Sequence, residues 1–239
     1  MKKNTLPALI AALCTVAGVL CMAVRQWLLT ADTDQKGLLV AGHPGDVISW
    51  ILTGLVLLSL IAVTVWYKPR CRFHDNRFSH IGNVSQASAL AFLSGPLLHT
   101  GSTVAVIAVI AALLTQLCCI AKILYQVNMK KFPPLLHCPL VIFYLLFLIY
   151  CYQDWSSQPQ LQLYGFQLLA LLCLTLAAYQ RAALAAAMGS SRMYFFASNA
   201  AVFLCLAAVP GAEHFLFFLL TAVATLLDGC ATGADREAV

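Results

Sequence analysis

The feature that most constrains this chain is a succession of apolar runs, each about 20 residues long, that continues from its start nearly to its end. A run of that length matches the hydrocarbon layer of a bilayer, which is roughly 30 Å thick. Of the 239 residues, 62% are hydrophobic and 10% are charged, whereas an ordinary globular domain is about 45–50% apolar and about 25% charged. One soluble core cannot hold that excess, so we expect the bilayer to be the solvent.

Backbone amides in lipid must be hydrogen-bonded within the protein, so the runs are either helices or strands of a closed barrel. They lack the strict alternation of barrel strands. We therefore predict an all-α fold, a polytopic transmembrane helix bundle in which residues 1–239 form a single integral membrane domain. The eight expected spans cover residues 6–28, 45–67, 84–100, 103–127, 134–152, 161–183, 193–210 and 212–229.

The third expected span is the weakest of the eight. It is short, carries Gln86 and three serines, and ends at Gly95 and Pro96, so a re-entrant hairpin is the alternative. Basic residues decide between the two, because they collect in short cytoplasmic loops. Eight spans place all of the fourteen basic residues except Arg25 and Lys36 on one side, and seven spans lose this asymmetry. The sequence therefore predicts eight spans with both termini in the cytoplasm.

A second expectation concerns the start of the chain and its cysteines. Lys2 and Lys3 followed by an apolar run are typical of a signal peptide, but the run continues to Leu29 and further spans follow, so we expect a retained first helix. The ten cysteines lie mostly inside apolar runs and form no C-x-x-C framework. They are interpreted as small hydrophobic residues.

Several segments of the chain have a familiar sequence, namely Tyr164 and the segments 154–162 (DWSSQPQLQ), 166–169 (FQLL), 177–180 (AAYQ), 37–40 (GLLV) and 42–44 (GHP). They resemble a family of uncharacterised multipass membrane proteins of anaerobic Gram-positive bacteria. The resemblance implies a multi-pass protein of the bacterial cytoplasmic membrane and carries over no catalytic or binding residue.

The candidate binding residues lie toward the outer end of the bundle. Gln160, Tyr164 and Gln167 recur at i, i+4 and i+7 and therefore share one helix face, which could bind a small polar solute. Alternatively, these groups hydrogen-bond to neighbouring helices and stabilise the bundle by about 1 kcal/mol or less apiece. Arg25, in the outer part of the first span, could bind a carboxylate or phosphate with Asp46, Asp154 or Glu213 nearby, or extend to the outer headgroups.

Other ionisable residues in the runs receive simpler interpretations. We expect Lys122 to extend to the inner headgroups without a functional role. Asp228 lies near the inner end of the last span, where Arg181 or Arg192 would compensate its charge, and a proton-relay carboxylate is the alternative. Three external histidines, His43, His99 and His214, have no metal-ligand spacing, so we expect no metal and no cofactor.

Three classes of function remain open. The leading hypothesis is binding or transport of a small solute or lipid within the bundle. The second is an accessory protein that binds another membrane protein, and the third is a lipid-modifying enzyme. We lean against an enzyme, because the chain contains no G-x-S-x-G, Walker or G-x-G-x-x-G motif. The expected partner is the lipid bilayer and not nucleic acid, because the basic residues lie between apolar runs rather than in one patch.

Overall fold

A computed structural model describes residues 5–31, 44–67, 77–100, 102–127, 133–156 and 161–233, and within them it contains helices and no strand. The all-α prediction is therefore confirmed. The helices are α1 (Thr5–Ala31), α2 (Pro44–Tyr67), α3 (Arg77–His99), α4 (Thr103–Val127), the short 3-10 helix η1 (Pro134–His137), α5 (Cys138–Trp155), α6 (Leu161–Ala185), α7 (Ser191–Ala208) and α8 (Phe215–Gly233).

Six of the described helical segments are long and apolar enough to cross a bilayer, which confirms a multi-pass membrane protein. Helix α8 contributes a shorter apolar stretch, Phe215–Gly229. Helix α3 is not among these segments, in agreement with the expectation that the third span is the weakest of the eight. The six segments are Leu6–Thr30, Pro44–Trp66, Thr103–Tyr125, Pro134–Trp155, Tyr164–Ala185 and Ser191–Ala208.

Helix α3 differs most from its expected bounds, because it begins at Arg77 rather than at residue 84. It continues through Pro96 to His99 as one helix, so this segment is not a re-entrant hairpin. Its polar residues Asn83 and Gln86 are buried against other helices. Hydropathy underestimates such a helix, because it records that side chains are polar but not that they face the protein interior.

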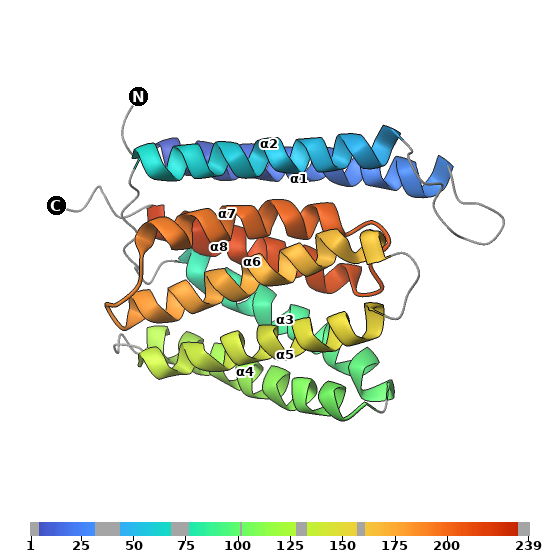
Figure 1. Cartoon of the computed structure of the whole chain (residues 1–239). Helices are drawn as coiled ribbons and strands as arrows, with labels where there is room; N and C mark the ends of the chain where they lie inside the picture. Colours follow the sequence, from blue (N-terminus) through green and yellow to red (C-terminus); the bar gives the residue numbers. More distant parts are fainter. Residues whose placement is uncertain are drawn as a thin grey trace.

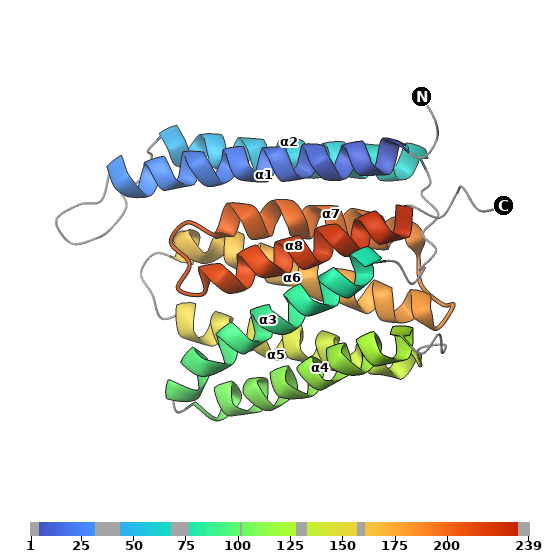
Figure 2. The same ribbon diagram turned by 180° about the vertical axis from the view of Figure 1, so that it is seen from behind.

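Helices α3 to α8 form a closed ring in which each helix contacts the next and α8 contacts α3. We call this unit the six-helix ring. Helices α1 and α2 form a hairpin that packs along its side, mainly on α7, as a separate layer (Figures 1 and 2). The first residues of α1 and the last of α8 lie at the same end of the bundle (Figure 1), where α3, α5 and α7 also begin. We call it the inner end.

Helix α7 is the central helix, because it contacts its ring neighbours and both helices of the hairpin. Small residues permit this close packing, among them the fully buried Ala197, Ala200 and Ala201. In α1, Gly18 faces α7 so closely that an added Cβ would lie 3.0 Å from the Leu206 Cβ and 3.1 Å from the Phe203 carbonyl oxygen. Close helix approach through small residues is the usual packing mode in membranes.

Aromatic side chains fill the middle of the six-helix ring. The rings of Phe143 and Phe147 from α5 lie 6.2 and 5.2 Å from that of Phe217 in α8, and Phe217 lies 5.4 Å from Phe218. These four residues, which we call the aromatic cluster, are completely or almost completely buried. Because α5 and α8 are not ring neighbours, the cluster packs across the interior of the ring.

The contact between the hairpin and α7 can be tested with matched glycine substitutions. Gly18→Ala should lower the free energy of unfolding by about 1–3 kcal/mol, because its methyl group meets the α7 backbone. Gly54→Ala is the control, since an added Cβ at Gly54 meets nothing within 4 Å. Both changes alter helix propensity equally. Thermal unfolding in one detergent measures the difference, and equal midpoints would contradict the packing of α1 on α7.

Candidate functional site

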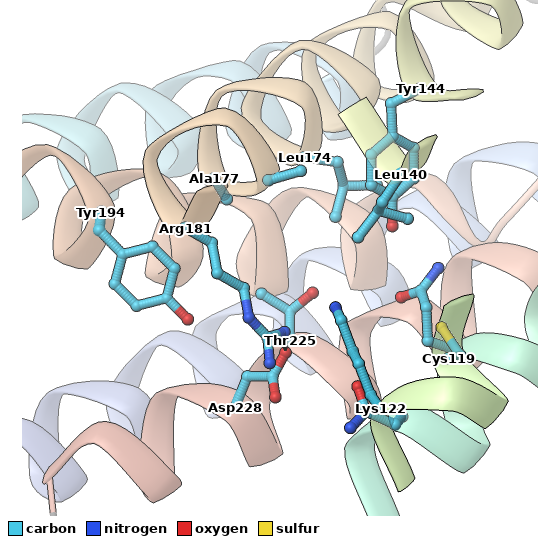
Figure 3. A pocket seen from close by; sticks show the side chains of 13 residues that line it. Cys119, Lys122, Leu140, Tyr144, Leu174, Ala177, Arg181, Tyr194, Thr225 and Asp228 are labelled. Carbon is cyan, nitrogen blue, oxygen red and sulfur yellow. Dashed lines mark hydrogen bonds and ion pairs between the residues drawn. The ribbon is translucent and has the colours of Figure 1, made fainter. Parts of the chain in front are cut away.

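A polar pocket lies inside the six-helix ring toward its inner end, and every helix of the ring contributes to its wall (Figure 3). We call it the inner pocket. It offers about 30 Å³ to the centres of water-sized molecules, which is room for one or two waters. The lining residues are Asn83, Gln86, Cys119, Lys122, Leu140, Tyr144, Leu174, Ala177, Ala178, Arg181, Tyr194, Thr225 and Asp228.

An ion pair joins two helices across the pocket. The Arg181 guanidinium on α6 donates a hydrogen bond to Oδ2 of Asp228 on α8, and both side chains are only 13% exposed. Figure 3 shows Arg181 reaching from α6 to Asp228, with Tyr194 on one side and Lys122 on the other. The expectation that Arg181 or Arg192 compensates Asp228 is therefore met by Arg181. A buried pair of this kind depends on both partners, because a single charge left in the interior is strongly destabilising.

Lys122 extends into the same pocket from α4. Its side chain is 5% exposed, and its ammonium lies 3.0 Å from Nδ1 of His137, the last residue of η1. The ammonium is the donor and the imidazole nitrogen is the acceptor. The expected extension of Lys122 to the inner headgroups is therefore wrong, because its charged end lies within the ring.

Uncharged polar groups complete the pocket. The amide nitrogens Nδ2 of Asn83 and Nε2 of Gln86 are buried, and neither donates a hydrogen bond within the described part of the chain. Gln86 and Thr221 lie beside the hydroxyl of Tyr144. Buried polar groups normally have partners. Two unused donors in one pocket therefore indicate a place where a ligand or ordered water can bind.

Helices α3 and α8 approach closely where they close the ring. Ser85 on α3 donates a hydrogen bond of 2.8 Å to the Leu220 carbonyl on α8. One turn earlier, an added Cβ at Gly82 would lie 3.3 Å from both the Ala224 carbonyl oxygen and Oδ1 of Asp228. A glycine at this position lets α3 carry Asn83 and Gln86 to the pocket and places its backbone beside the carboxylate.

The turn between α6 and α7 lies at the inner end of the ring. Ala187 adopts a left-handed backbone conformation with a φ of 60°, and Ser190 caps α7 by accepting a hydrogen bond from the Met193 amide. An added Cβ at Gly189 would lie 2.5 Å from the Leu184 backbone nitrogen. This tight turn fixes α6, which carries Arg181, against the first turn of α7.

Arg25 is buried inside the bundle rather than extended toward the outer headgroups. It is 4% exposed, donates a hydrogen bond of 2.9 Å to the Ala207 carbonyl of α7, and lies 4.2 Å from the centre of the Phe166 ring on α6. This is a cation–π geometry. Of its three predicted acidic partners, Asp46 lies within electrostatic range. Arg25 thus binds the hairpin to the ring.

The other predicted binding residues lie on α6 near its start. Gln167 is 1% exposed, and Tyr164 stacks on Trp155 with ring centroids 4.7 Å apart. Gln160 lies outside the described residues. The structure brings Arg25 to this part of α6 through Phe166, between Tyr164 and Gln167 in the chain. Neither Arg25 nor these two residues are among the described residues that line the inner pocket.

His214 lies at the outer end, in the turn between α7 and α8. Its ring centroid is 6.0 Å from that of Phe147, and burial lowers the pKa of His214, opposed by the nearby carboxylates of Glu213 and Asp154. His43 lies outside the described residues. Within the described ranges, no three side chains of the types that bind metals form a group able to hold an ion.

The sequence signal for the inner pocket is a set of polar residues in apolar surroundings. Lys122, Arg181 and Asp228 each interrupt or border an apolar run, and Asn83 and Gln86 lower the hydropathy of the segment that forms α3. Intramembrane charges usually face the bundle or a wet cavity. Their convergence depends on the order of helices in the ring, which no local pattern specifies.

No protein-family model matches this chain, and neither curated proteins nor solved structures show significant similarity to it.

A double-mutant cycle tests the ion pair. Arg181→Gln and Asp228→Asn should each lower the free energy of unfolding by about 3–5 kcal/mol, because each leaves a buried charge without its partner. The double variant should recover most of that loss. Arg192→Gln, at an exposed residue in the first turn of α7, is the control and should change little. Additive losses in detergent unfolding would show that the two side chains do not interact.

Proposed function

We propose that this multi-pass membrane protein binds a small polar solute or a lipid headgroup in the inner pocket. The observation that carries the proposal is the convergence of two basic side chains, one carboxylate and two unused amide donors inside a lipid-embedded ring. Ligand sites are concave and hold a few convergent polar groups within apolar walls. A bundle that served only to pack would be more stable with apolar side chains at these positions.

Access to the pocket is from the inner end. Of the aromatic cluster, Phe147 on α5 and Phe217 and Phe218 on α8 lie on the outer side of the residues of their helices that line the pocket. Leu140 and Tyr144, which line the pocket, lie nearer the start of α5 than Phe147 does. A ligand that reaches the pocket through the inner end therefore meets Arg181 and Lys122 before the aromatic cluster.

The proposed topology has eight spans, with the inner end in the cytoplasm of a bacterial cell. The location of the helix termini at one end of the bundle supports an even number of crossings (Figure 1). Helix α3 can cross the bilayer despite its polar residues, because it packs between α4 and α8 and its amides face the pocket. The asymmetry of basic residues supports the cytoplasmic placement of this end.

Reporter fusions test the topology. A reporter that is active only in the cytoplasm should be active when fused after Val239, and also when fused before Met1. The same reporter inserted between α1 and α2, at Asp34, should be inactive, since this loop is predicted to be external. Activity of the loop fusion together with inactivity of both terminal fusions would reverse the orientation.

The Arg25 region is the second candidate for ligand binding, and we favour the inner pocket over it. The Arg25 guanidinium already binds the Ala207 carbonyl and the Phe166 ring. A ligand there would have to break a contact that holds the hairpin on the ring. In the inner pocket, by contrast, the amides of Asn83 and Gln86 offer donors that no described residue uses.

Binding is tested by filling the pocket. Ala177 on α6 lines the pocket and is buried, whereas Ala182 on the same helix is half-buried and outside the lining. Thermal unfolding of the purified protein is measured with a panel of millimolar polar solutes and with added polar lipids. At least one compound should raise the midpoint of the wild type and of Ala182→Leu but not of Ala177→Leu. Equal responses of all three proteins would contradict binding in the inner pocket.

A further inference from the structure

We propose that the inner pocket binds the acidic group of an anionic ligand, a carboxylate or a phosphate, and that this group takes the place of Asp228 at the Arg181 guanidinium. This inference rests on the proposed binding function and names the class of ligand for the same pocket. It follows from the charge of the lining, the unused donors of its neutral side chains, the incomplete hydrogen bonding of Asp228 and the size of the space.

The charge of the lining favours an anion. Among the described residues that line the pocket, Lys122 and Arg181 are basic and Asp228 is the one acid. The guanidinium is a planar fork of donors that fits a carboxylate or phosphate with two hydrogen bonds. The Lys122 ammonium adds a second positive charge beside it. An anion therefore lowers the net charge of this buried cluster, whereas a cation would raise it.

Two of the neutral side chains that line the pocket carry unused donors. Asn83 and Gln86 are both more than nine-tenths buried, and their amide nitrogens donate no hydrogen bond to any described residue. The oxygens of a carboxylate or phosphate are strong acceptors for such groups. Both amides come from α3, so an acidic group bound to Arg181 on α6 would also connect these two helices across the ring.

Asp228 occupies the position that a ligand's acidic group would take. Its Oδ2 binds Arg181, but its Oδ1 is buried and accepts no hydrogen bond within the described residues. Gly82 rather than a donor side chain lies beside that oxygen. The carboxylate is thus only half satisfied, although buried charges normally require all their hydrogen bonds. A ligand oxygen that also reaches the α3 amides would compete with it effectively.

The space limits what enters. The space beside Asp228, about 30 Å³ for the centres of water-sized molecules, holds one or two waters. It is too small for a whole metabolite, and an acidic group would occupy it together with the position of the displaced Asp228 carboxylate. The remainder of the ligand would extend toward the inner end, past Tyr194. A soluble carboxylate or phosphate and the phosphate of a lipid headgroup share this chemistry, and the experiment distinguishes them.

The test uses the full chain in a neutral detergent. Thermal unfolding is followed in sodium phosphate and in sodium acetate, each compared with sodium chloride of the same ionic strength. Choline chloride and glucose are the cationic and neutral probes. Phosphate or acetate should raise the midpoint along a saturable curve, and choline and glucose should not.

Variants assign the effect to the pocket. Arg181→Lys keeps the positive charge but loses the planar pair of guanidinium donors. It should raise the half-saturating anion concentration about tenfold, because about one charged hydrogen bond to the anion is lost. Asp228→Asn removes the internal competitor and should lower that concentration about tenfold. Arg192→Gln, outside the lining, should respond as the wild type does. Size-exclusion profiles identify any variant that does not fold, and the Asp228→Asn result then still decides, because a merely structural ion pair predicts no gain in affinity.

Lipid nanodiscs identify the source of the anion. Native mass spectrometry of protein in phosphatidylglycerol and in phosphatidylcholine discs should show retained phosphatidylglycerol, lost in Arg181→Lys, if the ligand is a lipid. A response to soluble anions alone assigns a soluble ligand, and both results support the proposal. If choline or glucose protects the wild type but not Ala177→Leu, and no anion does, the pocket binds ligands but the anion class is wrong. If no probe of any charge protects the protein, both proposals fail.

Discussion

The arrangement of the ring depends on one constraint, namely that an ion inside a membrane protein must find its partner within the protein. Transfer of a charge to such surroundings is unfavourable by several kcal/mol after relaxation. Arg181 and Asp228 meet this constraint only if α6 and α8 keep their relative height in the bundle. Lys122 and His137 impose the same condition on α4 and η1. The polar contacts therefore fix the register of helices whose apolar surfaces alone would allow them to slide.

Helix α3 completes the ring through features that make it a poor membrane segment on its own. The buried amides of α3 reduce its hydropathy, and Gly82 contributes no side chain to its surface. Ser85 donates a hydrogen bond to the Leu220 carbonyl of α8. Each feature is unfavourable in an isolated helix surrounded by lipid but favourable in contact with α8. The pocket is complete only with α3 in place, because Asn83 and Gln86 form part of its lining.

The sequence predicted the bounds of most helices well, but it did not predict which helices contact one another. The expected span 103–127 coincides with α4 and the span 45–67 nearly coincides with α2, because apolar length is a local property. The start of α3 was missed, since its inward-facing polar residues resemble a loop. Lys122 was misplaced, because its partner lies in η1 and depends on how α4 and α5 meet. Charge alone suggested the pairing of Arg181 with Asp228. The contribution of the Asn83 and Gln86 amides to the pocket was not predicted, because no periodicity in the sequence shows which side chains line the same cavity.

The aromatic cluster joins two helices that are not neighbours around the ring. Phe143 and Phe147 of α5 meet Phe217 of α8. This contact across the interior consequently consists of side chains alone. A change of their rotamers would alter the packing in the middle of the ring without separating any two adjacent helices, so the interior can vary while the walls of the ring stay unchanged.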